Sequence, residues 1–194
     1  MREAVRNGWD DVRLWIDRAF TIRGAGTVVT GTLTAGTLGV GAELELAGGT
    51  VTVRGLQSLG HTQQRVPSVA RVAVNLRGVP LERLHRGAAL LSPGRWRSTE
   101  VVDVRLSGDE AGMHAMLHIG SAAVPVRVRS LGLGTARLTL ARPLPLRIGD
   151  RAVLRDPGTG RIPAGVTVLD VLPTPLRRRG AGQHAHRRST RWKA

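Results

Sequence analysis

Apolar and polar residues alternate along most of this chain, which is the pattern of β-strands that have one buried face. In "ARVAVNL" (70–76), Val72, Val74 and Leu76 share one face and Arg71 lies on the other. The segments "TEVVDVRL", "VPVRVRSL", "TARLTLARPLPL" and "VTVLDVL" alternate in the same way, with Arg127 and Arg129 on the exposed side. Many short segments of this kind predict an all-β protein.

The segment "ELELAGGTVTVR" predicts a β-hairpin. A two-residue turn at the double glycine 48–49 places Leu44 opposite Val53. Leu46 then lies opposite Val51, so that both apolar pairs share one face, as a half-buried hairpin requires.

Breaks in the pattern divide the chain into two β-barrels. Pro93-Gly94 in "LSPGRW" interrupts both helix and strand, and alternating segments resume after it. The final segment is rich in arginine, has no acidic residue and has no apolar period, which is typical of a disordered basic tail. We therefore predict two consecutive antiparallel β-barrels followed by a tail, with these ranges: linker 1–11, first barrel 12–92, second barrel 96–173, tail 174–194.

Composition adds a partner class to this picture. The chain has 194 residues and a net charge of +15, from 29 basic and 14 acidic residues, which favours an anionic partner such as nucleic acid. It has no cysteine, so disulfides and thiolate metal sites are excluded. No apolar stretch approaches the roughly 20 residues of a membrane helix, and the start does not resemble a signal peptide. We expect a cytoplasmic protein with no membrane partner.

The glycine-rich stretch "TIRGAGTVVTGTL" (21–33) superficially resembles a nucleotide-binding loop. Gly26 and Gly31 have the spacing of a phosphate loop, but Thr32 stands where the phosphate-binding lysine must be. Residues 27–29 are poor helix formers, which also disfavours a dinucleotide fingerprint. The stretch instead predicts a hairpin loop shaped by Gly24 and Gly26, with Gly31 at a bulge or bend.

The same stretch carries a family resemblance. "VRLWIDRAFTIRGAGTVVTGTL", "VRGLQ", "RVAVNLRGV" and "HRGAAL" resemble the second domain of translational GTPases, and most of all that of the selenocysteine-specific elongation factors. "MHAMLHIGSAAVPVRV", "ARLTLARPLPLRIGDRAVLRDPG" and "VLDVLP" resemble the third domain of those factors. The resemblance covers about residues 12–173. The GTPase motifs and the winged-helix domains that read the messenger hairpin in this family have no counterpart in the sequence.

The resemblance implies a non-enzymatic piece of such a factor, which binds the acceptor end of selenocysteinyl-tRNA for incorporation at recoded UGA codons. Its other implied partners are the ribosome and the GTPase domain of the same factor. It implies no cofactor for this chain, whereas GTP and Mg²⁺ belong to the full-length family member. The pocket of the family carries over onto Asp17, Arg18 and Arg71, with the arginines as a cationic wall and Asp17 binding the amino group or orienting an arginine.

Strand alternation conflicts with that pocket. It places Leu14, Ile16, Arg18 and Phe20 on one face and Asp17 on the other, so Asp17 and Arg18 reach a common pocket only at a bulge or a strand end. An ion pair between Arg18 and Asp17 or another acid is the purely structural alternative.

Other polar residues give weaker candidates. His114 and His118 have a helical metal spacing, but on a strand four residues span ~13 Å, too far for one ion. His61 lies in a polar loop and is a candidate contact to the acceptor end, while Asp150 in "GDRAVLRD" is expected to cap a turn. We assign no catalytic residue and no metal ligand.

Two alternative functions remain open from the sequence. The barrels are also consistent with the middle domains of another translational GTPase, of the elongation factor Tu or initiation factor type. A general basic protein that binds RNA or ribosomes through charge alone is the second alternative.

Overall fold

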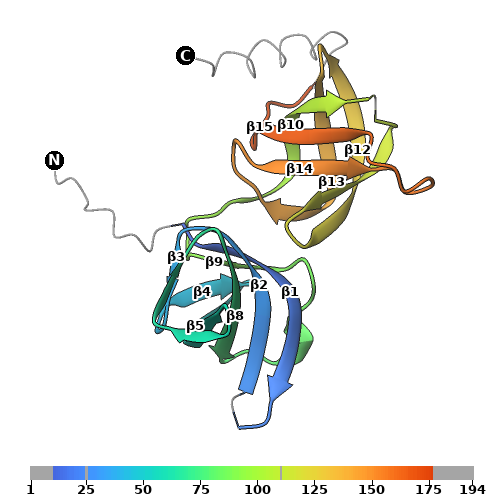
Figure 1. The fold of residues 1–194 in the computed structure, drawn as a ribbon. Helices are drawn as coiled ribbons and strands as arrows, with labels where there is room; N and C mark the ends of the chain where they lie inside the picture. The colour runs from blue at the N-terminus through green and yellow to red at the C-terminus, as the bar shows by residue number, and fades with distance from the viewer. Residues whose placement is uncertain (1–10, 25, 110, 177–194) are drawn as a thin grey trace, which may run out of the picture. The chain divides into compact units, whose positions relative to one another are not determined.

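The computed structural model describes residues 11–24, 26–109 and 111–176. The predicted linker 1–11, apart from Asp11, and the predicted basic tail from residue 177 onward lie outside these ranges, as do Trp9, His184, His186 and Trp192. The chain divides into two compact units at Trp96 and Arg97 (Figure 1). Each unit is an antiparallel β-barrel, which confirms the predicted fold class.

The first barrel is a ring of strands in the order β4-β9-β1-β2-β8-β5, closed by pairing of β4 with β5. β6 extends this sheet beside β5, β3 pairs with β7 in a separate small sheet, and a short 3-10 helix, η1, precedes β9. The bounds are β1 Arg13–Ile22, β2 Gly26–Ala35, β3 Thr37–Gly39, β4 Glu43–Leu46, β5 Gly49–Ser58, β6 His61–Gln63, β7 Arg65–Pro67, β8 Ala70–Arg77, η1 Leu81–Arg83 and β9 Ala89–Leu91.

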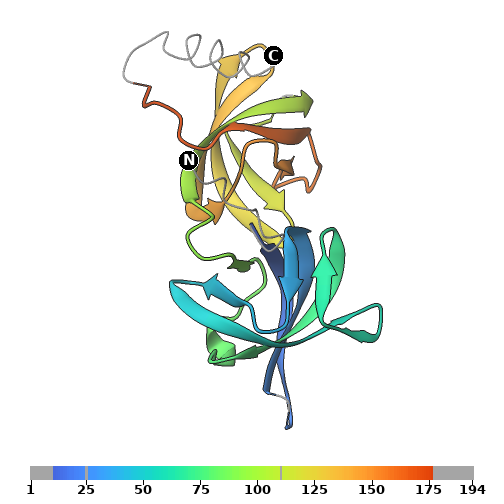
Figure 2. The same ribbon diagram turned by 90° about the vertical axis from the view of Figure 1, so that its left-hand side faces the viewer.

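The second barrel closes in the order β10-β13-β12-β11-β14-β15. Figure 2 shows the strands of each barrel curving around their own core, and the β1–β2 hairpin extending beyond the rest of the first barrel. The bounds are β10 Ser98–Gly108, β11 His114–Ile119, β12 Ala122–Gly132, β13 Thr135–Pro145, β14 Arg151–Arg155 and β15 Ala164–Asp170. Within the described ranges, no helix is both long enough and apolar enough to cross a membrane.

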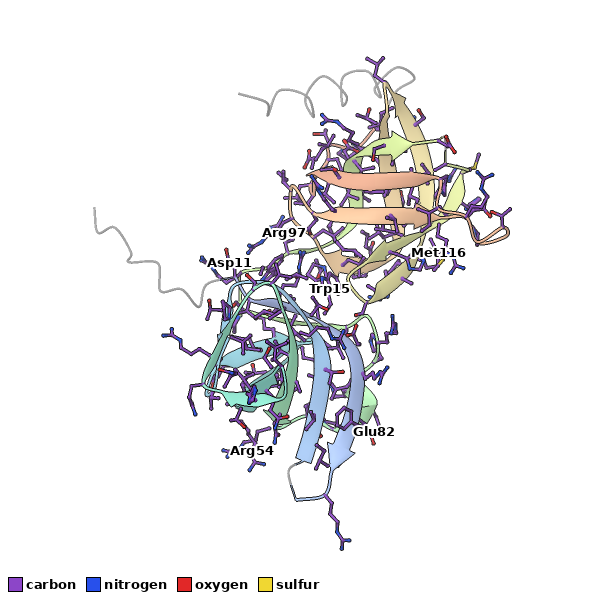
Figure 3. All side chains as sticks on the ribbon, in the orientation of Figure 1. Asp11, Trp15, Arg54, Glu82, Arg97 and Met116 are labelled. Carbon is purple, nitrogen blue, oxygen red and sulfur yellow. The ribbon has the colours of Figure 1, made fainter. Side chains whose placement is uncertain are left out.

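The cores follow the predicted alternation in most strands. In β8, Val72, Val74 and Leu76 are buried and Arg71 is exposed. In β12, Arg127 and Arg129 are exposed, as predicted. Charged side chains such as Arg54 and Glu82 point outward from the first barrel (Figure 3). Because aromatic residues are scarce, the cores consist mainly of interlocking Val and Leu side chains.

The β4–β5 hairpin has a different register from the predicted one. Leu44 pairs with Val51 and Leu46 with Gly49, so the turn is formed by Ala47 and Gly48. Both turn residues have positive φ, 46° and 77°, as a type I′ turn requires. The right-handed twist of the strands favours this turn strongly enough to place an alanine in the left-handed region. All the apolar partners still share the buried face, because the shift is by two residues.

Gly31 lies at a point where two strands approach closely. A Cβ at this position would overlap the carbonyl oxygen of Trp15 and would lie 2.6 Å from Cδ2 of Leu14. The predicted hairpin glycines are also confirmed, since Gly24 and Gly26 have φ of 83° and 90° at the β1–β2 turn. Gly31 is therefore required by the packing of β1 against β2.

Replacing Gly31 with alanine is expected to destabilise the first barrel by about 1–3 kcal/mol, the usual cost of overpacking. The matched control is Gly55→Ala, because a Cβ there meets nothing within 4 Å. Denaturant unfolding followed by tryptophan fluorescence reports on this barrel, since Trp15 and Trp96 belong to its unit. Equal midpoints for the two variants would contradict the packing argument.

The second barrel contains a buried ion pair. Arg137 on β13 donates from Nε to Asp103 Oδ1 at 2.7 Å and from Nη2 to Asp103 Oδ2 at 2.9 Å. Both residues are buried, and Nη1 of Arg137 also donates to the carbonyl of Thr174 at 2.7 Å. The bidentate geometry and the third hydrogen bond compensate the desolvation of both charges.

Asp103→Ala is expected to cost about 3–5 kcal/mol of stability, because it leaves a buried guanidinium uncompensated. The double variant Asp103→Leu with Arg137→Met removes both charges and is expected to be markedly more stable than Asp103→Ala. Chemical denaturation of the three proteins checks this order. A double variant that is no more stable than the single one would show that packing, and not charge burial, sets the cost.

Candidate anion-binding site on the first barrel

An extra residue interrupts the pairing of β1 with β2. Ile16 pairs with Gly31 and Arg18 pairs with Thr30, so Asp17 has no partner residue on β2 and forms a β-bulge. This is the irregularity that the sequence required if Asp17 and Arg18 were to share one surface. Gly31 lies on β2 opposite this bulge, as predicted from the sequence.

After the bulge, the inward-facing and outward-facing positions of β1 are exchanged. Leu14 and Ile16 are buried before it, and Ala19 packs against the same core after it. Arg18 and Phe20 are therefore exposed. The predicted grouping of Arg18 and Phe20 with Leu14 and Ile16 is wrong, because simple alternation assumes an unbroken ladder.

Asp17 and Arg71 form an ion pair above the outer surface of the barrel. Nη1 of Arg71 donates to Oδ2 of Asp17. The Asp17 side chain is 16 % exposed and that of Arg71 is 65 % exposed. β2 lies between β1 and β8, with Thr32 paired to Arg71, so the arginine side chain reaches across β2. Of the two roles expected for Asp17, orienting an arginine fits this contact.

Arg18 lies on the same outer surface, in the row Arg18–Thr30–Ala73. Arg18 makes no hydrogen bond and no ion pair with any residue that the structure describes, so the alternative of an Arg18–Asp17 ion pair is wrong. Two of the three expected site residues are thus in contact, and the third, Arg18, directly follows Asp17 on β1 with its side chain exposed.

A hollow of about 240 Å³ lies over β2, β5, β6 and β8 of the same barrel. Ala73, two residues after Arg71, is part of its wall, and Asn75 and Gln57 contribute amide groups. The remaining wall is formed by Ile22, Val28, Gly55, Leu56 and Thr62. The hollow was not predicted from the sequence. A signal for it was present, because small and amide residues alternate with the buried positions of β8.

The β5–β6 hairpin lies beside Arg71. The hydroxyl of Ser58, at the end of β5, donates to the carbonyl oxygen of Arg71 at 3.0 Å. Ser58 pairs with His61, which is exposed at the start of β6. His61 is therefore on the same barrel wall as Arg71, and its proposed contact with the acceptor end stays a prediction.

The two histidines with a helical metal spacing lie on a strand of the second barrel. His114 and His118 are on strand β11, where Ala115, Leu117 and Ile119 alternate with them as buried residues. Within the described ranges, no group of three or more His, Asp or Glu side chains could hold a metal ion.

The motif "GDRAVLRDPG" consists of a strand between two carboxylate-capped turns. Asp150 Oδ2 accepts from the backbone N–H of Arg147 at 2.8 Å, which is the predicted turn cap. Asp156 Oδ1 accepts from the N–H groups of Thr159 and Gly158, at 2.7 and 2.9 Å. The Thr159 hydrogen bonds above all favour the charged carboxylate and lower the pKa of Asp156. The motif therefore has a structural explanation.

Over most of its length, the chain is similar to a group of translation elongation factors. No protein-family model matches the chain. The chain is 31 % identical over 186 residues to the selenocysteine-specific elongation factor of Desulfomicrobium baculatum, covering 87 % of this chain and 29 % of that protein. It is 36 % identical over 168 residues to the corresponding factor of Escherichia coli strain K12, covering 83 % and 27 %. The chain thus spans under a third of the length of these relatives.

A shorter similarity extends to elongation factor Tu 2 of Streptomyces avermitilis, 37 % identical over 81 residues, which is 41 % of this chain and 21 % of that protein. Among solved structures, a bacterial selenocysteine-specific elongation factor, EF-Sec, superposes with a TM-score of 0.84 at 22 % identity, covering 96 % of this chain and 32 % of that one. Elongation factor SelB from Methanococcus maripaludis gives a TM-score of 0.70 at 23 % identity, covering 89 % and 45 %. These two structures support the shared fold.

The Asp17–Arg71 ion pair is expected to contribute less than about 1 kcal/mol to stability, because Arg71 is largely exposed. A double-mutant cycle with Asp17→Asn, Arg71→Gln and the double variant measures its coupling energy by chemical denaturation. A coupling of several kcal/mol would instead assign the pair a structural role.

Proposed function

From its homology to the selenocysteine-specific elongation factors, we propose that this chain binds the aminoacyl end of selenocysteinyl-tRNA on its first barrel. The single observation that carries the proposal is the bulge at Asp17, which brings Asp17, Arg18 and Arg71 onto one surface. These three residues are the ones that the family resemblance implies.

The chemistry of the esterified amino acid explains why arginines suit this site. A selenol is more acidic than a thiol and is an anion near neutral pH, whereas the hydroxyl of serine is neutral. A guanidinium beside the anion gains a charge-assisted hydrogen bond. The same guanidinium beside a neutral hydroxyl loses water without equal compensation. A site of this kind favours selenocysteine over serine on the same tRNA.

Asp17 gives Arg71 a defined position before the ligand arrives. An exposed arginine without a partner samples many rotamers, and ordering it costs conformational entropy. The ion pair with Asp17 holds the guanidinium over β2, within the surface that also bears Arg18. The hollow beside Ala73, with both apolar and amide walls, suits the remainder of an aminoacylated nucleotide.

The residues that resemble a phosphate loop do not fit GTP. Residues 26–31 lie within strand β2, which continues to Ala35, so no helix N-terminus follows Gly31 to bind phosphates, and Thr32 replaces the phosphate-binding lysine. GTP and Mg²⁺ therefore require residues outside this stretch. We propose that the chain acts with a GTPase domain and on the ribosome, and that it does not itself hydrolyse GTP.

Arg71→Ala is expected to reduce the preference for selenocysteinyl-tRNA over seryl-tRNA by at least about tenfold, since a hydrogen bond to a charged group is worth about 1.5–3 kcal/mol. Arg77→Ala is the matched control, because Arg77 is an exposed arginine on the same strand. Equilibrium binding of both charged tRNAs and of deacylated tRNA to the full chain provides the measurement.

Each alternative function predicts a different result in this assay. A wild-type protein that binds all three tRNAs equally, with a steep dependence on salt, would identify a general basic RNA-binding protein. A preference for aminoacylated tRNA of any kind would identify a factor of the Tu type. An unchanged preference in Arg71→Ala would contradict the assignment of the site.

A further inference from the structure

Two threonine hydroxyls lie between the arginines of the proposed site. The register of β2 places Thr30 in the row Arg18–Thr30–Ala73, and Thr32 in the row Trp15–Thr32–Arg71. Neighbouring strands lie about 4.8 Å apart. Each threonine is therefore one strand away from one of the two guanidinium-bearing residues, on the strand that the Arg71 side chain crosses to reach Asp17.

Both threonines lie on the outer surface. Val29 and Leu33 of β2 are in the core, so Thr30 and Thr32 alternate outward from them. Each is half-buried, which means that part of its water shell is already lost. A ligand that supplies a hydrogen-bond acceptor there replaces that water without the full cost of desolvating an exposed group.

Their hydroxyls differ from those of the other threonines near the ends of β2. Thr27 donates to the carbonyl of Val79 at 3.1 Å, and Thr34 donates to the carbonyl of Arg13 at 3.1 Å. Among the residues that the structure describes, the hydroxyls of Thr30 and Thr32 have no hydrogen-bond partner, although the backbones of both residues are paired with β1 and β8. The threonine hydroxyls of β2 that are available to a ligand are therefore those of Thr30 and Thr32, on the strand between Arg18 and Arg71.

We propose that Thr30 and Thr32 are specificity-determining residues of the site, and that their hydroxyls donate hydrogen bonds to the anionic side chain of the bound aminoacyl group. The inference rests on the proposed function. A neutral donor strengthens binding of an anion more than that of a hydroxyl, because hydrogen bonds to a charged acceptor are roughly twice as strong. The threonines therefore add to the discrimination that the arginines begin.

The proposal also explains which residue types occupy the outer face of β2. Its outer positions between the arginines need residues that favour a strand and carry a donor but no charge. Threonine meets both needs, since its β-branch suits a strand. A serine would keep the donor at a lower strand propensity, and a valine would keep the shape without the donor.

The test is hydroxyl removal by Thr30→Val and Thr32→Val, singly and together, with Thr52→Val as the matched control. Thr52 is a half-buried threonine on β5, away from both arginine rows. We expect the double variant to bind selenocysteinyl-tRNA about tenfold more weakly and seryl-tRNA only about threefold more weakly. The Thr30→Ser with Thr32→Ser variant should restore most of the difference, and deacylated tRNA should bind all variants alike.

The outcomes separate this inference from the proposed function. If the valine variants keep wild-type discrimination while Arg71→Ala loses it, the threonine proposal is overturned and the arginine site stands. If deacylated tRNA weakens equally with the charged tRNAs, the hydroxyls contact RNA and the proposal is again overturned. If Arg71→Ala has no effect, the proposed function itself falls. Thermal unfolding of each variant confirms that binding is compared between folded proteins.

Discussion

The first barrel depends on one irregularity in strand pairing. A single extra residue, Asp17, is accommodated in β1 opposite Gly31, which has no side chain to obstruct the approach of Trp15 and Leu14. From that point the alternation of β1 is reversed, so that Ala19 completes the core and Arg18 is exposed. The packing of the core and the composition of the outer surface are thus decided by the same residue.

Two of the arginine–aspartate pairs that the structure describes illustrate opposite uses of charge. Arg137 and Asp103 are buried and joined by a bidentate contact, so removing one partner leaves an uncompensated charge. Arg71 is largely exposed, and its pairing with Asp17 is therefore expected to contribute little to folding. The contact engages Nη1 of Arg71 and leaves the side chain 65 % exposed, so other N–H groups of the guanidinium stay accessible to a ligand.

The proposed recognition combines groups from neighbouring strands. β1 contributes Asp17 and Arg18, β8 contributes Arg71, and β2 contributes the hydroxyls of Thr30 and Thr32 between them. Strands fix these groups more precisely than loops do, and here β2 is paired with β1 on one side and with β8 on the other. In this proposal, the hollow on the same barrel offers apolar and amide contacts to the remainder of an aminoacylated nucleotide.

The sequence by itself determined the all-β class, the two barrels, the exposed face of β8 and the hairpin glycines. These features follow from local patterns: period-two alternation, turn residues and breaks in composition. The Asp17 bulge was anticipated only as a condition for the site, and the register of the β4–β5 hairpin was predicted two residues away from its actual position. Register depends on which turn best matches the twist of both strands, and apolar alternation is unchanged by a shift of two.

Tertiary structure alone decided which acid pairs with which base, where the hollow lies, and which threonines lie between the arginines. Each of these depends on strand order, β1-β2-β8, which joins residues more than 50 positions apart, as in the Arg71–Asp17 contact. A strand in isolation shows which residues share a face. Only the closed barrel shows which strands are neighbours, because closure is set by the burial of all the apolar faces together.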